Sequence, residues 1–217
     1  MPYSSSPTME KASTQVESCQ RTTLSPVCLL VTPRTLQFFF VIGTLILLPA
    51  ARLHGALSIG ATYPLSFVDI DGNKHSTADG HVTVIVLTTP ADREKAHTVG
   101  DRVPEHSLGN PDYRMITIIR FARKHTVLGQ RIATALIRHR VNEEAKRLQA
   151  RYDGKKIARD ARKDIFVATD FDGSVSSQLG EPEGATAFCV FVFGRKGELI
   201  AQWHGVPSAE QLAAAVK

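Results

Sequence analysis

A short uncharged run in the first half of the chain, Val82-Thr-Val-Ile-Val-Leu87, constrains the fold most strongly. Consecutive β-branched and aliphatic side chains are typical of a strand that is buried on both faces of a sheet. Gly80 precedes the run, and Pro90 follows it at the position where a helix would begin. Asp92 lies in the first turn of that helix, where the helix dipole favours negative charge. A buried strand that leads into a helix predicts an α/β protein with a central sheet.

The rest of the chain after residue 57 continues this alternation. We expect a hairpin-like element at 63–74, strands at 113–121, 164–170, 188–193 and 198–203, and helices at 91–106, at 127–160 and after Ser208, with 152–154 as a candidate break in the long helix. The apolar positions of that helix recur at intervals of three to five residues, which we interpret as one helical face: Ile132, Leu136, Val141, Ala145 and Leu148. Strand–helix–strand units imply parallel pairing through right-handed crossovers, and a terminal hairpin adds antiparallel strands. Ser208 and Gln211 have the spacing of a capping box. The sequence therefore predicts a mixed α/β sheet with helices on both faces.

The first 56 residues differ in composition from the rest. Residues 1–35 are rich in Ser, Thr and Pro and lack periodic apolar positions, so we expect a disordered lead. Residues 36–51 form an apolar run that is shorter than the ~20 residues needed to span a bilayer. An internal core helix, an uncleaved membrane anchor and a signal peptide cleaved near Ala56 are the three interpretations.

We favour the signal peptide among these three. The predicted organisation is a lead at 1–35, a signal peptide or membrane anchor at 36–56, and one domain at 57–217. The expected location is periplasmic or secreted, with anchoring in the inner membrane through residues 36–51 as the alternative. Cys19 and Cys28 precede the apolar run and would be removed on cleavage, which would leave Cys189 alone.

Four segments, taken in order, resemble those of the thioredoxin-like superfamily, in particular its peroxiredoxin and periplasmic thiol-reductase branches. They are the opening apolar segment and turn at 63–72, the buried strand at 82–87, a strand with an Asp-Gly turn at 165–173, and a terminal hairpin with a closing helix at 190–212. The resemblance implies a thioredoxin-like fold over residues 57–217. Small periplasmic members that also lack the cysteine motif are the most similar group.

Two parts of the redox site that the resemblance implies are missing. The reactive cysteine of the family would fall near residues 88–93, where this chain has Thr-Thr-Pro-Ala-Asp-Arg. A hydroxyl is a far weaker nucleophile than a thiolate at neutral pH, so Thr88 and Thr89 cannot take over thiol–disulfide exchange. The family's cis-proline would lie near Phe188, where this chain has no proline. A non-proline cis bond costs about 2.5–4 kcal/mol, so we expect a trans peptide there.

We therefore predict an exported binding or assembly module without redox catalysis, and no cofactor. Its partner would be a protein. The first candidate contact surface is the degenerate active-site face, formed by Thr88, Thr89, Asp92, Arg93 and Phe188.

The alternative hypothesis is a thiol oxidoreductase or peroxidase relative that acts through Cys189 or through a partner's cysteine. Cys189 lies in the apolar run Phe188-Cys-Val-Phe-Val-Phe193, which predicts a buried strand. A buried cysteine there is most often a small apolar residue with an unreactive thiol. The alternative requires an exposed Cys189 with a depressed pKa.

Positive charge is concentrated between Arg120 and Lys163, where fourteen Lys/Arg stand against four Asp/Glu, although the whole chain carries a net charge of only +5. A solvated helix face is the ordinary explanation, and an anionic partner is the functional one. No aromatic residue occurs in this stretch between Phe121 and Tyr152, which argues against nucleic acid as a partner. The second candidate surface consists of Arg138, Arg140 and Arg147.

Other chemistry has weaker support in the sequence. His97 and Asp101 are four residues apart on an expected helix, but no third metal ligand accompanies them, so we expect no metal site. His204 follows Trp203 at a strand end, where packing or capping is the expected role. No glycine-rich phosphate loop and no nucleophile elbow occurs.

Overall fold

The computed structural model describes residues 56–182 and 184–217. The earlier segments at 1–35 and 36–55 lie outside the described residues, so the lead and the signal or anchor segment stay predictions. The strands are β1 (Ser66–Val68), β2 (Lys74–Ser76), β3 (Val82–Thr88), β4 (Tyr113–Arg120), β5 (Ile165–Asp170), β6 (Cys189–Phe193) and β7 (Leu199–His204). The α-helices are α1 (Arg93–Arg102), α2 (Val127–Gly154), α3 (Ser174–Gln178) and α4 (Ala209–Ala215), and short 3-10 turns occupy Pro90–Asp92, Glu105–Ser107 and Ala161–Asp164.

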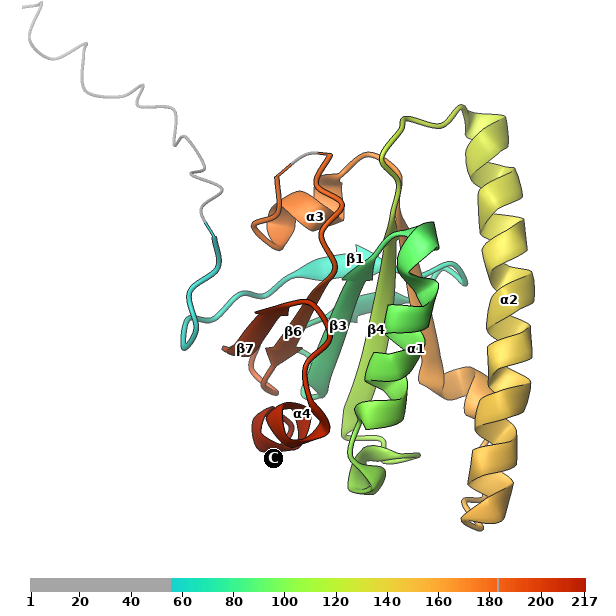
Figure 1. Ribbon diagram of the computed structural model, residues 1–217, viewed down its shortest axis with the longest axis vertical. Helices are drawn as coiled ribbons and strands as arrows, with labels where there is room; N and C mark the ends of the chain where they lie inside the picture. The colour runs from blue at the N-terminus through green and yellow to red at the C-terminus, as the bar shows by residue number, and fades with distance from the viewer. Residues whose placement is uncertain (1–55, 183) are drawn as a thin grey trace, which may run out of the picture. The chain divides into compact units, whose positions relative to one another are not determined.

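Five strands form the central sheet in the order β5-β4-β3-β6-β7 (Figure 1). β3 pairs in parallel with β4, and β4 in parallel with β5, while β6 and β7 are added antiparallel beyond β3. β1 and β2 form a separate antiparallel hairpin. The predicted mixture of parallel crossovers and a terminal hairpin is confirmed.

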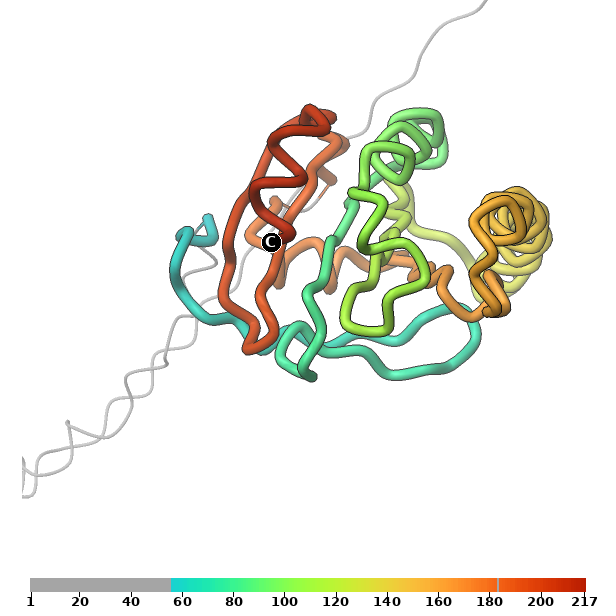
Figure 2. Tube along the Cα trace, turned by 90° about the horizontal axis from the view of Figure 1, so that it is seen from below, coloured from blue at the N-terminus to red at the C-terminus, as the bar shows by residue number. Residues whose placement is uncertain are grey.

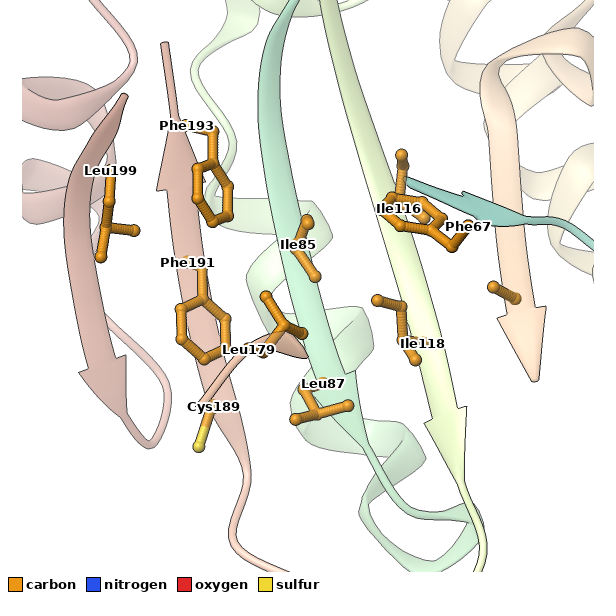
Figure 3. Packing of buried hydrophobic residues seen from close by; sticks show 11 residues of the cluster. Phe67, Ile85, Leu87, Ile116, Ile118, Leu179, Cys189, Phe191, Phe193 and Leu199 are labelled. Atoms are coloured by element: carbon orange, nitrogen blue, oxygen red, sulfur yellow. The ribbon is translucent and has the colours of Figure 1, made fainter. Parts of the chain in front are cut away.

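Buried apolar side chains form two larger clusters on the two faces of the sheet and a third, smaller one of Ile70, Val141 and Val167. The face toward α1 and α4 contains Val84, Val190 and Leu212. The opposite face contains Phe67, Leu179 and the inward side chains of β3, β4 and β6, among them Ile85, Phe191 and Phe193 (Figure 3). In Figure 2 the β1–β2 segment crosses one face while α1 and α4 cover the other. Because α3 supplies Val175 to the opposite face and is followed there by Leu179, helices lie on both faces as predicted.

Three helix boundaries differ from the prediction. α1 is shorter than 91–106, and a helix at Ser174–Gln178 replaces part of an expected turn. α2 ends at Gly154 rather than near residue 160, because Lys156 adopts a left-handed conformation with φ 57°. The amide of Ile157 then donates to the carbonyl of Tyr152 at 2.9 Å, which closes the helix in a Schellman motif.

The predicted single apolar face of α2 is wrong, because at about 100° per residue Ile132 and Leu136 lie on the side of the helix opposite Val141 and Ala145. Val141 and Ala145 are buried, but Ile132 and Leu136 are 54% and 58% exposed. The C-terminal half of the helix packs against β5 and the turn at Ala161–Asp164, whereas its first half carries an apolar stripe that no described residue covers. Among residues 56–182 and 184–217, no helix combines the length and the apolar character that crossing a bilayer requires.

Candidate functional site

The loop after β3 holds the first predicted surface, and its polar groups bind one another. The Thr89 hydroxyl donates to Asp92 Oδ2 at 3.1 Å, and Lys95 Nζ lies 2.7 Å from Asp92 Oδ1. The hydrogen bond from Lys95 lowers the pKa of Asp92, which is therefore ionised at neutral pH. Thr88 is buried, and its hydroxyl donates to the Thr89 carbonyl. The hydroxyl groups of this loop thus bind neighbouring groups of the same loop, and the loop contains no nucleophile for thiol chemistry.

Arg93 and Phe188 do not join this group in the way the sequence suggests. Arg93 is exposed and pairs with its neighbour Glu94, at 3.0 Å. Phe188 is 5% exposed and packs in the core with Val190, so its prediction as a surface residue is wrong. The reason is that Phe188 precedes a strand whose alternate side chains face α1 and α4. No peptide bond in the described residues is cis, as expected for a loop without the family's proline.

A groove of about 730 Å³ runs between α1 and α2 over β4 and β5. Met115, Ile119 and Val167 form its floor, and Ile137 and Leu148 line it from α2. A smaller apolar hollow of about 180 Å³ extends it to Thr88, Thr89 and Pro90. Both share Arg93, Ala96 and Ile137 among their lining residues, so the degenerate active-site face opens into one continuous groove.

The three arginines of the second predicted surface have different roles. Arg138 Nε lies 3.4 Å from Asp71 Oδ1, and its guanidinium also donates to the Ile70 carbonyl, which ties α2 to the turn between β1 and β2. Arg140 lies at the groove rim. Arg147 is exposed and pairs with Glu144 of the same helix at 3.4 Å. Arg140 and Arg147 are thus accessible, and Arg138 is a structural contact.

His97 and Asp101 are used in contacts between helices. His97 Nδ1 lies 3.3 Å from Glu144 Oε2, and Asp101 Oδ1 accepts from Arg151 at 3.3 Å. These pairs join α1 to α2 across the groove. The spacing that suggested metal ligands instead places two side chains on the face that looks toward α2.

Cys189 is the one cysteine among the residues that the structure describes, and it has no exposed surface. Its Sγ donates to Glu181 Oε1 at 3.4 Å and lies 3.2 Å from His204 Nδ1. Burial raises the pKa of the thiol to about 12, and the Glu181 carboxylate adds to the effect. Such a thiol is a poor nucleophile at neutral pH. The predicted burial is confirmed, but the surroundings are polar on one side rather than wholly apolar.

The sequence does not predict that Glu181 and His204 contact Cys189. Cys189 and His204 are register partners in the β6–β7 hairpin, so counting across the turn at Gly194–Gly197 could have brought them together. Glu181 comes from the irregular segment after α3, and Arg120 from the end of β4. Nothing in the local pattern around those two residues marks them.

No protein-family model matches this sequence, and no curated protein matches it. Many solved structures are similar to part of it, among them the following three. The exposed lipoprotein thioredoxin Etrx1 from Streptococcus pneumoniae is 12% identical, with a TM-score of 0.46, over 70% of this chain and 97% of its own. StoA from Bacillus subtilis is 15% identical, with a TM-score of 0.44, over 72% and 100%. A thioredoxin-family thiol:disulfide interchange protein from Chlorobium tepidum is 13% identical, with a TM-score of 0.43, over 74% and 97%.

None of these similarities is close enough to assign an activity. The two parallel crossovers and the antiparallel hairpin before the last helix are those that the sequence predicts, and the strand order is β5-β4-β3-β6-β7. The described chain has a thioredoxin-like fold.

Proposed function

We propose that this chain is an exported binding or assembly module that uses a thioredoxin-like fold without redox catalysis. The proposal is carried by one observation: the described part of the chain has no accessible, reactive thiol. The loop at the end of β3 has threonines where a reactive cysteine would stand, and Cys189 is fully buried with its pKa raised to about 12. Thiol–disulfide exchange requires an accessible thiolate, and neither position supplies one.

The contact surface that we propose is the groove between α1 and α2. It reaches the loop at Thr88–Pro90 and has an apolar floor with Arg93, Arg140 and Arg147 among its lining residues. Leu136 lines the smaller hollow and is 58% exposed, so apolar surface is available to a partner without unfolding. Apolar surface of this kind, bordered by charge, is typical of interaction sites.

The proposed occupant is a segment of a partner protein that presents apolar side chains flanked by Asp or Glu. Charge complementarity supports this choice at Arg140, which lines the groove and has no ion pair among the described residues, whereas Arg147 is already paired with Glu144. Electrostatic complementarity of this kind raises the association rate and selects among partners. Export is proposed from the apolar run at 36–51 and its similarity to a signal-peptide core.

Site-specific photo-crosslinking in the producing cell tests the proposal with the full chain. A photoreactive residue at Leu136 should give a discrete protein adduct, whereas one at Lys196, in the β6–β7 turn, should not. Adding Arg140→Glu and Arg147→Glu should reduce the Leu136 adduct by tenfold or more. Arg93→Ala tests the contribution of the loop in the same way, and Lys163→Glu serves as the matched charge control away from the groove lining.

A disulfide-turnover assay on the same purified chain separates this proposal from the thiol oxidoreductase alternative. We expect no turnover of a disulfide or peroxide substrate above the buffer rate. Turnover that disappears in Cys189→Ser would overturn the proposal in favour of the alternative. Equal adducts from Leu136 and Lys196, or adducts unaffected by both charge reversals, would remove the groove as the contact surface.

A further inference from the structure

Three side chains that commonly bind metals meet on the sheet face opposite the groove. Cys189 is the first residue of β6, His204 is the last residue of β7, and Glu181 comes from the segment after α3. One ligand atom from each of the three lies within 4.8 Å of the others. We refer to them as the Glu181–Cys189–His204 cluster. The hairpin register holds two of the three, because Cys189 and His204 are opposite one another across β6 and β7.

The distances in this cluster are close to those of a metal coordination sphere. Cys189 Sγ is 3.2 Å from His204 Nδ1 and 3.4 Å from Glu181 Oε1. A tetrahedral zinc ion with bonds of roughly 2.0–2.3 Å separates its sulfur ligand from nitrogen or oxygen ligands by about 3.6 Å. The two separations from the sulfur atom are thus within a few tenths of an ångström of those in a zinc site, and the third pair of ligand atoms lies within 4.8 Å. Thiolate, imidazole and carboxylate together suit zinc better than calcium or magnesium, which take oxygen ligands.

The guanidinium of Arg120, which lies beside the Glu181–Cys189–His204 cluster, is a second and independent feature of this site. Arg120 is 4% exposed, and its Nε and Nη1 groups have no hydrogen-bond partner among the described residues. Arg120 Nη1 lies 3.8 Å from Glu181 Oε2, while the other oxygen of that carboxylate faces the thiol. Its third nitrogen, Nη2, donates to the Ala187 carbonyl, which also accepts from Cys189 Sγ at 3.7 Å. A buried guanidinium thus lies beside the carboxylate oxygen that does not face the thiol, and two of its N–H groups remain without an acceptor among the described residues.

Access to the cluster is from one side. Cys189 and Glu181 are buried, but His204 is exposed, so an ion would reach the thiol past the imidazole. Three protein ligands leave the fourth tetrahedral position for a small anion or a partner's side chain. An anion there, near Arg120, would also give the unpartnered N–H groups an acceptor.

We propose that Glu181, Cys189 and His204 form a zinc-binding site, with Arg120 as a positioning residue for the Glu181 carboxylate. Zinc binding forms bonds to Sγ, Nδ1 and a carboxylate oxygen and releases the thiol proton to solvent, so the affinity rises with pH. The site lies on the face of the sheet away from the groove, and it does not depend on the proposed binding function.

The test uses the full chain with Cys19→Ser and Cys28→Ser, so that Cys189 is its only thiol. Titration with Co²⁺ alone should produce a near-ultraviolet thiolate-to-cobalt charge-transfer band that saturates at one equivalent, and Zn²⁺ alone should remove it. Cys189→Ser should abolish the band. His204→Ala, at an exposed position, should weaken the affinity at least tenfold while the chain stays folded.

A matched control and a second readout keep the outcome unambiguous. His139→Ala, on the exposed face of α2, should bind cobalt as the parent chain does. Zn²⁺ should raise the melting temperature of the parent and of His139→Ala, but not that of His204→Ala, because only the folded site binds the ion. The absence of a charge-transfer band, or equal affinity in His204→Ala and His139→Ala, would overturn the proposal.

Discussion

The guanidinium of Arg114 binds both carboxylate oxygens of Asp79, with two hydrogen bonds of 2.7 Å. Arg114 is a buried residue of β4, and Asp79 lies in the turn between β2 and β3. The same guanidinium donates to Thr83 Oγ1 at 3.1 Å. This bidentate pair connects the β1–β2 hairpin to the central sheet and makes a buried cation compatible with the core.

Acid should weaken the protein through this pair. Burial would raise the pKa of Asp79, but the hydrogen bonds from Arg114 and His81 outweigh it and lower the pKa to about 2. A carboxylate with a depressed folded-state pKa stabilises the protein above its unfolded pKa, and that contribution is lost as the pH falls from about 4 to 2. Asp79→Asn should therefore cost about 1–2 kcal/mol at pH 7, after allowance for partial exposure.

Urea unfolding from pH 7 to pH 2 measures this effect. The difference between the parent chain and Asp79→Asn should shrink toward pH 2. Asp112→Asn removes a comparable but exposed pair with Arg195 and serves as the control, with a smaller change expected. A constant difference at all pH values would mean that Asp79 does not act through its charge.

Cys189 should be protected from thiol reagents while the chain is folded. Burial and the Glu181 carboxylate raise its pKa to about 12, so both access and ionisation oppose labelling. In the full chain with Cys19→Ser and Cys28→Ser, we expect labelling at pH 7 to be at least a hundredfold slower than in urea-unfolded chain. The labelling rate should follow the population of open states.

Glu181→Gln separates the two causes of this protection. Removing the charge should lower the pKa of Cys189, while burial still keeps the labelling slow. Fast labelling of the folded parent chain below pH 7 would contradict the prediction and favour the thiol oxidoreductase alternative.

The apolar stripe on the first half of α2 should contribute little to the stability of the free chain. Ile132 is 54% exposed, so Ile132→Gln should change the free energy of unfolding by no more than about 0.5 kcal/mol. Val141, 5% exposed on the second half of the same helix, is the matched comparison, and Val141→Ala should cost about 1–3 kcal/mol. Urea denaturation measures both. A large cost for Ile132→Gln would mean that residues outside the described part cover this stripe.

This helix shows what the sequence could and could not predict. Intervals of three to five residues suggested that its apolar positions share one face, but an interval of five between Leu136 and Val141 turns the helix by well over one full turn. Ile132 and Leu136 therefore lie on the side opposite Val141 and Ala145, and only the second pair is buried. Strands and pairing directions were predictable because uncharged β-branched runs and short connections restrict them strongly.

The candidate sites were less predictable than the fold. Cys189 and His204 meet through strand register, which could be counted from the sequence, but Glu181 and Arg120 arrive from elements far away in the chain. The loop at Thr88–Asp92 was predicted from a local resemblance and lies where expected. Phe188 was wrongly predicted to lie on the surface. It directly precedes β6, and the alternation of side chains along that strand directs the Phe188 ring into the core.

The N-terminus of α4 provides a test of a feature that the sequence did predict. Ser208 Oγ accepts from the Gln211 amide at 3.2 Å, and Gln211 Oε1 accepts from the Ser208 amide at 2.8 Å. Because this capping box satisfies two backbone donors, Ser208→Ala should cost about 1 kcal/mol. Ser177→Ala, in α3, is the control, since its hydroxyl caps no helix. Equal unfolding free energies for the two variants in urea would contradict this role.

Asp69 should be the most costly carboxylate to remove. It is buried and accepts four hydrogen bonds, from the amides of Asp71 and Asn73 at 2.9 and 2.8 Å, from Asn73 Nδ2 at 3.0 Å, and from His75 Nε2 at 2.9 Å. Asp69→Ala leaves buried donors without an acceptor and opens the turn that joins β1 to β2, so we expect a loss of about 2–4 kcal/mol. Asn73→Ala keeps the backbone donor and should cost less than about 1 kcal/mol.

Burial opposes ionisation of Asp69, but the hydrogen bonds led by that of His75 lower its pKa overall, so this stabilisation too is lost as the pH falls below about 4. Urea unfolding of both variants at pH 7 gives the comparison, and equal losses would show that the turn does not depend on the Asp69 carboxylate.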